Sequence, residues 1–233
     1  MSRIGLLNEK PLHASLKQWY AQPGDRFEVP VDGFVIDIVR GDLLLEIQTR
    51  HFGAIKSKLA ALVASHRVRL IYPISREKWI VQAPAKGRGA GVRRKSPKSG
   101  RVEDLFRELV AIPRLLSHRN FSLEVLLTHE EETRRLDRRR WRTRGWVTEE
   151  RRLLDVVDRR VFDGPSSWLA LLPAFSGPFT SKDIAQAKCV PLDLAQKMTY
   201  SMRHAGLLEP VGRRGRATLY RAAASECSTV VNA

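Results

Sequence analysis

Apolar and polar residues alternate in the N-terminal third of the chain in a way that predicts a small α/β unit. Residues 34–39 and 43–48 are two short apolar runs, and the Arg-Gly-Asp between them supplies turn chemistry, so they predict a β-hairpin. Between residues 52 and 63 apolar side chains recur at helical spacing, and residues 68–72 form another apolar run. The predicted order is strand, strand, helix, strand.

Each strand of this hairpin carries an acid near its middle, Asp37 in the first and Glu46 in the second. Strand interiors usually avoid acids. Side chains alternate between the two faces of a strand, so Asp37 and Glu46 converge if their faces coincide, with Gln48 one step further along. The alternative is that both are half-exposed strand acids paired with some of the many arginines.

The arrangement of these elements resembles the core of the PD-(D/E)XK nuclease superfamily, which includes restriction enzymes and Holliday-junction resolvases. The resemblance covers roughly residues 1–84 and rests on an aspartate in one strand, E-x-K in the next, then a helix and a strand. Asp37 matches the first acid and Glu46 the second, whereas Gln48 stands where the lysine usually is. The resemblance implies a restriction-endonuclease-like mixed sheet flanked by helices, and metal-dependent cleavage of DNA or RNA.

The residue types suit phosphodiester hydrolysis. A divalent cation orients a water molecule and stabilises charge on the phosphate. Mg²⁺ or Mn²⁺ prefers carboxylate oxygens and also binds substrate phosphates. Asp37, Glu46 and the carbonyl group of Ile47 would supply such a site.

The residue that replaces the motif lysine is the main departure from the family pattern. Gln48 can donate a hydrogen bond to water or phosphate but carries no charge. Lys56, on the following helix, could return a cation to the site from another backbone position. Lys58 is the poorer candidate, because it lies two positions further on and is expected to point elsewhere.

The residues before the hairpin predict a helix over 6–21 and an edge strand over 27–31 that contains a proline. Some members of the superfamily place a glutamate from the preceding helix near the metal, and Glu9 is the residue that matches. The alternative role for Glu9 is a favourable acid at a helix N-terminus.

The middle of the chain is less regular. Residues 79–83 predict a strand, and residues 85–100, rich in glycine and basic residues, predict a loop or disordered segment. A helix is expected over 102–112 and a strand over 121–128, in which Glu124 is expected to face solvent; the alternative for Glu124 is another acid near the site. The 85–100 loop is expected to contact a phosphate backbone through Arg93, Arg94, Lys95 and Lys98.

Residues 129–146 are dominated by charge, with Trp141 and Trp146 among the arginines. Basic residues interleaved with aromatic ones can hold nucleic acid through phosphate contacts and stacking. The alternative is a solvated helix whose tryptophans pack on the body of the protein.

Charge and composition favour a polyanionic partner. The 233 residues carry a net charge of +16, from 41 Lys and Arg against 25 Asp and Glu. Cys189 and Cys227 lie far apart, as is usual for a protein of the reducing cytoplasm. The polar N-terminus argues against a signal peptide, and no apolar run reaches the length of a membrane span. Nucleic acid is therefore favoured over lipid, and DNA over RNA.

The C-terminal part resembles a winged helix-turn-helix domain over residues 165–224. Helices are expected over 165–174, over 182–187 and from Pro191 to Gly206, followed by two short strands around GRRGR. Winged helices usually place the third helix in the major groove and bind the backbone with the wing, although some bind proteins. The resemblance implies DNA contacts from Lys197, Tyr200, Arg203, Arg213, Arg214 and Arg216.

The sequence thus predicts a nuclease-like α/β domain over 1–160, a winged-helix domain over 161–224 and a tail over 225–233. The expected function is that of a cytoplasmic, Mg²⁺- or Mn²⁺-dependent nuclease acting on DNA. Asp37 and Glu46 are the expected metal ligands; Gln48, Lys56 and Glu9 are the other catalytic candidates. The alternative is a catalytically inactive nucleic-acid-binding or regulatory protein of the same fold. A homodimer is compatible with either.

Overall fold

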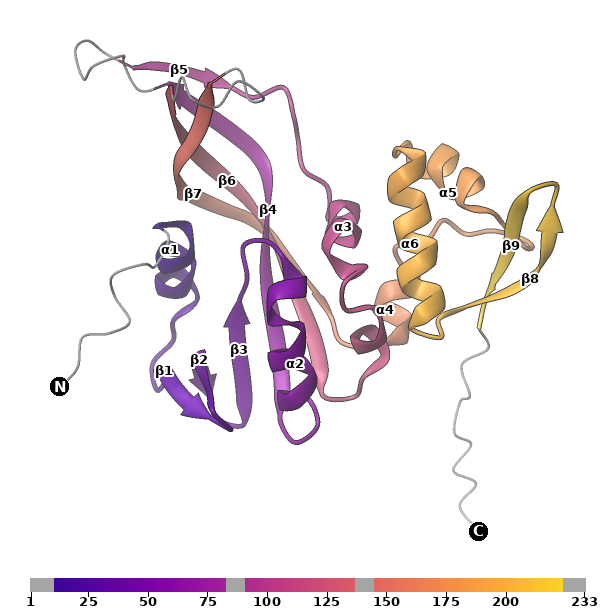
Figure 1. Cartoon of the computed structure of the whole chain (residues 1–233), viewed down its shortest axis with the longest axis horizontal. Helices are drawn as coiled ribbons and strands as arrows, with labels where there is room; N and C mark the ends of the chain where they lie inside the picture. The colour runs from indigo at the N-terminus through magenta and orange to yellow at the C-terminus, as the bar shows by residue number, and fades with distance from the viewer. Residues whose placement is uncertain (1–10, 83–90, 137–144, 224–233) are drawn as a thin grey trace.

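The computed structural model describes residues 11–82, 91–136 and 145–223, which form a mixed α/β structure (Figure 1). Within this part of the chain one sheet has seven strands, in the order β1-β2-β3-β4-β6-β7, with β5 paired to β4. The first three strands are antiparallel, β3, β4 and β6 are mutually parallel, and β7 returns antiparallel to β6. The strands are β1 (Arg26–Val31), β2 (Phe34–Arg40), β3 (Leu43–Ile47), β4 (Arg67–Gln82), β5 (Val92–Lys95), β6 (Phe121–Leu136) and β7 (Trp146–Phe162).

Helices cover both faces of the sheet. Leu44 of β3 belongs to the larger apolar core, together with α2 (Lys56–Leu62) and α3 (Phe106–Leu109). The next residue, Leu45, points the other way and packs with α1 (Pro11–Tyr20) in a second, smaller core. Adjacent strand residues face opposite sides, so α1 lies on one face and α2 with α3 on the other. Short 3₁₀ segments adjoin the helices at η1 (Phe52–Ile55), η3 (Val102–Leu105) and η4 (Pro113–Ser117).

The N-terminal hairpin and the helix after it are as the sequence predicts. Leu45 lies opposite Ile38, and Gly41 adopts a φ of 57° in the tight turn, a conformation that glycine adopts without strain. The apolar positions of the following helix are buried at Phe52, Leu59 and Leu62. The described part of the first helix starts at Pro11, because residues 1–10 lie outside the described part of the chain.

The middle strands are much longer than predicted. The two expected strands around residues 68–72 and 79–83 are one 16-residue strand, β4, interrupted only by a shift in register between Ser75 and Glu77. Pro73 lies inside this strand. It is tolerated because β3 ends at Ile47, opposite Ile71, so one edge of β4 is unpaired there.

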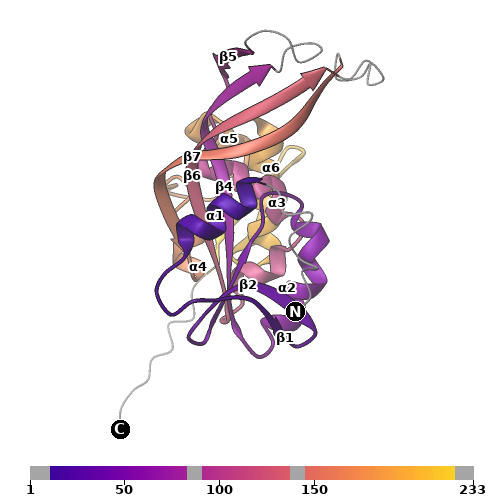
Figure 2. The same ribbon diagram turned by 90° about the vertical axis from the view of Figure 1, so that its left-hand side faces the viewer.

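The charge-rich segments also form strands, which corrects the loop expected over part of 85–100 and the helix that was the alternative for residues 129–136. Residues 92–95 are strand β5 rather than loop, and residues 129–136 continue β6 rather than forming a helix. Together with β7, which the sequence analysis did not predict, they build a curved arm that extends beyond α1 (Figure 2). Trp141 and residues 83–90 lie outside the described part of the chain.

Ion pairs between neighbouring strands explain why so polar an arm is ordered. Buried Glu132 of β6 accepts hydrogen bonds from Lys78 of β4 at 2.9 Å and from Thr148 of β7 at 2.9 Å. It also accepts one from Arg134 of its own strand at 2.6 Å. These contacts hold the pKa of Glu132 down to about 2, against the opposing effect of burial. Cross-strand pairing of opposite charges replaces the apolar alternation that marks an ordinary strand.

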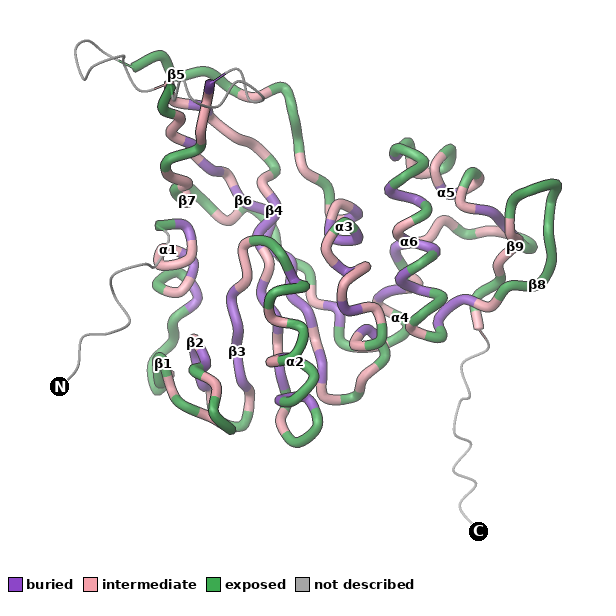
Figure 3. The backbone as a smooth tube through the Cα atoms, in the orientation of Figure 1, coloured by how far each residue is buried: buried purple, intermediate pink, exposed green. Residues whose placement is uncertain are grey.

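The C-terminal unit has three helices and an antiparallel hairpin (Figure 1). Thr180 caps α5 by accepting a hydrogen bond from the Asp183 amide, while the Asp183 carboxylate accepts one from the Thr180 amide. Much of the hairpin is exposed (Figure 3). The elements are α4 (Pro165–Leu169), α5 (Ser181–Lys188), α6 (Leu192–His204), β8 (Leu208–Arg214) and β9 (Ala217–Ala222).

This unit is anchored to the sheet through Trp168. Trp168 is 1% exposed, and its ring stacks on that of Phe162 at the end of β7, with ring centroids 4.4 Å apart. Its Nε1–H donates to the Leu116 carbonyl group at 2.9 Å. Arg107 of α3 also pairs with Asp193 of α6 at 2.9 Å, so α3 and α6 are fixed side by side. No helix in the described ranges is long and apolar enough to cross a membrane.

Candidate functional site

Asp37 lies where β2 separates from β3. The ladder between these strands runs from Arg40 and Leu43 to Ile38 and Leu45 and stops there. One step further on, Asp37 Oδ2 accepts the amide proton of Ile47 at 2.8 Å, so the side chain takes the place of a ladder hydrogen bond. The same oxygen lies 3.2 Å from Nε2 of His13 on α1. The carboxylate is therefore fixed by a strand on one side and a helix on the other.

Glu46 occupies the facing position on β3 and is only 7% exposed. Its Oε1 accepts a hydrogen bond from Lys58 Nζ at 2.6 Å, and the same ammonium group donates to the Val35 carbonyl oxygen at 2.7 Å. Its Oε2 is buried and has no hydrogen-bond partner among the described residues. A buried, unpaired carboxylate oxygen is costly unless a proton, a cation or a ligand satisfies it.

The two acids have opposite pKa shifts. Burial raises the pKa of Glu46 to about 7, the charge of Asp37 adds to this, and Lys58 opposes it. Burial acts in the same direction on Asp37, but the hydrogen bond and charge of His13, the Ile47 amide and the charge of Lys58 outweigh it and lower the pKa of Asp37. One acid that holds a proton near neutrality and one that stays ionised are typical of functional sites.

The lysine whose ammonium group lies beside the two acids is Lys58 and not Lys56. Residues two apart on a helix point in directions about 200° apart. Lys58 therefore reaches the acids, while Lys56 lines a hollow on the other side of α2, beside Ala111 and Tyr200. The expectation that Lys58 points elsewhere is therefore wrong. The register of the helix against the sheet decides between them, and the spacing of apolar residues gives this only approximately.

Gln48 is engaged elsewhere. Its side-chain Nε2 donates to the carbonyl oxygens of Arg50 and His51, at 2.5 and 3.3 Å, in the loop that follows β3. His51 has a φ of 61°, a left-handed turn in which the amide group of Gln48 holds the loop. The expectation that Gln48 points to the acids is not supported by any contact within the described residues.

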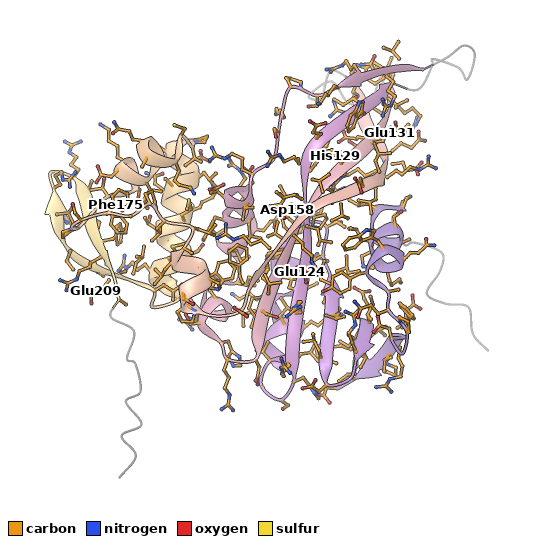
Figure 4. The ribbon with its side chains drawn as sticks, turned by 180° about the vertical axis from the view of Figure 1, so that it is seen from behind. Glu124, His129, Glu131, Asp158, Phe175 and Glu209 are labelled. Atoms are coloured by element: carbon orange, nitrogen blue, oxygen red, sulfur yellow. The ribbon has the colours of Figure 1, made fainter. Side chains whose placement is uncertain are left out.

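The sequence analysis also considered Glu9 and Glu124 as acids near the site. Glu9 lies outside the described residues. Glu124 does not face solvent as expected: it is 1% exposed and lies within the sheet (Figure 4). It accepts a hydrogen bond from the hydroxyl group of Tyr20 at 2.6 Å and pairs with Arg69 at 3.5 Å, so it forms part of the packing between α1 and the sheet.

The predicted phosphate contacts of the central segment lie on β5 or just after it. Arg93 pairs with Glu131 and Lys95 with Glu77, both at 2.7 Å, and both cations lie over the ring of Trp79. Arg94 and Lys98 are exposed. Strand β5 lies at the far end of the arm from β2 and β3, which carry the acid pair (Figure 1).

The predicted contacts of the C-terminal unit are on its surface. Tyr200 and Arg203 are exposed on α6, while Lys197 pairs with Asp193 one turn away at 3.2 Å. Arg213 and Arg216 are exposed in the β8–β9 hairpin. Arg214, in the same hairpin, pairs with Asp183 of α5 at 3.1 Å, so the hairpin is held against that helix.

The donor set suits a cation bound through few protein ligands. Among the described residues no group of three or more His, Cys, Asp or Glu side chains could hold a metal ion. Asp37 and Glu46 with the unpaired Oε2 remain as a two-carboxylate set. Mg²⁺ is commonly bound by one or two carboxylates together with waters and substrate phosphates, so these residues fit such an ion.

Comparison with known proteins places this core in a family. The model of a family described as a domain of unknown function, DUF8091, matches residues 10–163, which run from α1 to the end of β7. An uncharacterized protein of Treponema pallidum (strain Nichols) is 32% identical over 222 residues, which is 94% of this chain and 87% of that protein. No solved structure matches. The chain is a member of the DUF8091 family.

Proposed function

We propose that this protein hydrolyses phosphodiester bonds in nucleic acid, with DNA as the favoured substrate and Mg²⁺ or Mn²⁺ as the cofactor. The observation that carries the proposal is the meeting of Asp37, Glu46 and Lys58 in one partly buried cluster. The order α1-β1-β2-β3-α2-β4, with the acids on β2 and β3, is similar to the core of PD-(D/E)XK nucleases.

Asp37 and Glu46 would hold the divalent cation. When bound, the cation activates water as a nucleophile and neutralises charge on the phosphate. The unpaired Oε2 of Glu46 supports this assignment, because a buried acceptor with no donor fits a cation. His13 holds Asp37 in place, and the pKa shift keeps that acid ionised and ready to bind.

Lys58 takes the role that the motif lysine has in related sites. Its ammonium group is held by Glu46 and by the Val35 carbonyl group, which fixes a positive charge at the edge of the acid pair. A fixed cation there can orient the attacking water or stabilise the charge that develops on the phosphate. Gln48 then serves the loop after β3, and its lack of charge does not leave the site without a cation.

The C-terminal unit would act as a winged helix that binds the substrate. The order of three helices and a hairpin, the capped α5 and the exposed side of α6 support this assignment. Arg213 and Arg216 would contact the phosphate backbone from the hairpin. The chain would then consist of a nuclease-like part and a binding part that meet at the Phe162–Trp168 stack.

The second candidate is a nucleic-acid-binding protein without catalysis. The commitment of Gln48 to the carbonyl groups of Arg50 and His51 favours it, because this removes the usual third motif residue from the acids. In that case the Lys58–Glu46 pair is a structural ion pair. Binding to nucleic acid would then need no divalent cation.

A cleavage assay on the full chain separates the two candidates. Supercoiled, branched and single-stranded DNA and an RNA strand are incubated with Mg²⁺ or Mn²⁺. We expect cleavage by the wild type, none by Asp37→Ala, and unchanged cleavage by the matched control Asp42→Ala, whose side chain is exposed in the hairpin turn. Equal activity of wild type and Asp37→Ala, or no cleavage of any substrate by the wild type, would favour the binding protein.

A further inference from the structure

Two hollows beside α6, where the C-terminal unit meets the sheet domain, are lined by basic residues and by no acid. One hollow, of about 510 Å³, is lined by Lys56 of α2, Arg114 of η4, and Tyr200 and His204 of α6, over an apolar floor that includes Val110 and Ile112. A second hollow, of about 420 Å³, lies between α6 and the hairpin and is lined by Lys182, Arg203 and Arg216. Tyr200 lines both, so the two hollows adjoin at this side chain, and together they are called the groove below.

The cations of this groove are available for a ligand. Neither hollow is lined by an acid. No ion pair involving Lys56, Arg114, Lys182, Arg203 or Arg216 occurs among the described residues. By contrast, Arg93 and Lys95 on the arm are engaged by glutamates. An anionic chain that lies in the groove meets positive charge from both parts of the protein and no repulsion from a lining carboxylate.

The shape and the aromatic residue favour a single strand over a duplex. Tyr200 is 46% exposed, and its ring lies 4.3 Å from the ring of His204, which holds it at the junction of the hollows. The floor around Val110, Ile112 and Leu115 is apolar and concave. Bases that are not paired can enter such a floor and stack on an aromatic ring, whereas a duplex keeps its bases inside and presents phosphates.

We infer that a single-stranded segment of nucleic acid binds across this groove, with a base against Tyr200 and its phosphates toward Lys56, Arg114 and Arg203. The inference rests on the proposed function, and it assigns the substrate a single-stranded region beside the candidate site. Helix α2 connects the two: Lys58 on one side meets the acids, and Lys56 on the other lines the groove.

The test measures the affinity of the full chain for a fluorescent oligothymidylate and for a duplex of the same length, without divalent cation. We expect the wild type to prefer the single strand. Tyr200→Ala should weaken single-strand binding about tenfold, whereas Tyr200→Phe should retain most of it because the ring is kept. The double variant Lys56→Gln/Arg114→Gln should weaken binding of the single strand to a similar degree. The matched control is Arg159→Gln, an exposed arginine of β7 that lines neither hollow.

Circular dichroism of each variant checks its fold, and photo-cross-linking of a halogenated uracil strand to the wild type should map to Tyr200. Wild-type affinity in Tyr200→Ala and in the double variant, a preference for duplex, or no binding of the single strand at low salt would each overturn the inference. If single-strand binding depends on Tyr200 but no metal-dependent cleavage occurs, the groove stands and the proposed catalysis fails. If Asp37-dependent cleavage occurs while Tyr200→Ala binds the single strand normally, the proposed catalysis stands and the groove fails as the binding site.

Discussion

Lys58 Nζ lies 2.6 Å from Oε1 of Glu46, while the other oxygen of that carboxylate is buried without a hydrogen-bond partner in the described part of the chain. The ion pair therefore satisfies only half of the carboxylate. The remaining oxygen can be satisfied by a proton or by a metal cation. Protonation of Glu46 is favoured as pH falls, whereas binding of a cation requires the ionised carboxylate and is favoured as pH rises.

The first prediction concerns the pH dependence of stability. The pKa of Glu46 is raised from 4.5 to about 7 in the folded protein, so between these pH values the folded state holds a proton that the unfolded state has lost. The Glu46 contribution to the free energy of unfolding thus falls as pH rises through this window and then levels off. Glu46→Gln should remove that fall and be more stable at pH 8 by on the order of 1–3 kcal/mol without metal.

Urea unfolding at pH 5 and pH 8 measures this difference. Asp42→Asn is the control, because that exposed acid in the turn after β2 should leave the pH profile unchanged. An unchanged difference between the two pH values in Glu46→Gln would show that Glu46 is ionised throughout and that its pKa is normal.

The second prediction concerns metal binding. A cation that binds only the folded state stabilises it by about 2.7 kcal/mol at 100 times its Kd. For a chain of this size that corresponds to a rise in Tm of about 5–10 °C. Mg²⁺ or Mn²⁺ should therefore raise the Tm of the wild type at pH 8, and Asp37→Asn should abolish the rise because it removes one of the two carboxylate ligands.

Differential scanning fluorimetry with and without each cation makes this measurement, and Na⁺ at equal ionic strength controls for screening. A metal response of the same size in Asp37→Asn would place the metal elsewhere on the protein. An absent response in the wild type would leave Asp37 and Glu46 as structural acids.

The third prediction concerns the junction of the two parts. Trp168 stacks on Phe162 and donates its ring N–H to the Leu116 carbonyl group, so Trp168→Ala removes a buried ring and a hydrogen bond together. The loss should be about 3–5 kcal/mol in the free energy of unfolding. Trp168→Phe should cost less, because it keeps an aromatic ring on Phe162 and loses the ring N–H. Urea unfolding followed by circular dichroism compares them.

Trp19 supplies the control for this series, because this residue of α1 is 43% exposed. Trp19→Ala should cost about 1 kcal/mol or less. If Trp168→Ala costs no more than Trp19→Ala, the stack contributes little to stability and the two parts are held by other contacts.

The local pattern was sufficient to predict the hairpin with its two acids. Asp37 and Glu46 stand in short strands whose flanking residues are apolar, and a tight turn sets their register. The apolar spacing of Leu194, Met198 and Met202 likewise predicted the buried side of α6. In both cases the signal is a repeat within one element.

Features set by distant segments could not be predicted in the same way. Strand β7 fully buries only Phe162 at its end, and it is ordered by pairing with β6 and by contacts of Leu153 and Val156 under α1. Lys58 was ranked below Lys56 because the rotation of α2 against the sheet depends on packing, which the helical period does not fix. His13 came near Asp37 through the position of α1, 24 residues away in the chain.

The central claim is that the ammonium group of Lys58 is the positively charged side chain that assists catalysis beside the acid pair Asp37 and Glu46. The most direct test is the single-turnover rate of cleavage by Lys58→Ala at saturating substrate and Mg²⁺, beside the control Arg67→Ala, whose side chain is exposed and pairs with Asp42. Loss of a group that acts only in the transition state should lower the rate by about 10²–10³-fold and leave substrate affinity nearly unchanged. A rate within about twofold of the wild type, in a protein whose wild type cleaves, would contradict the account.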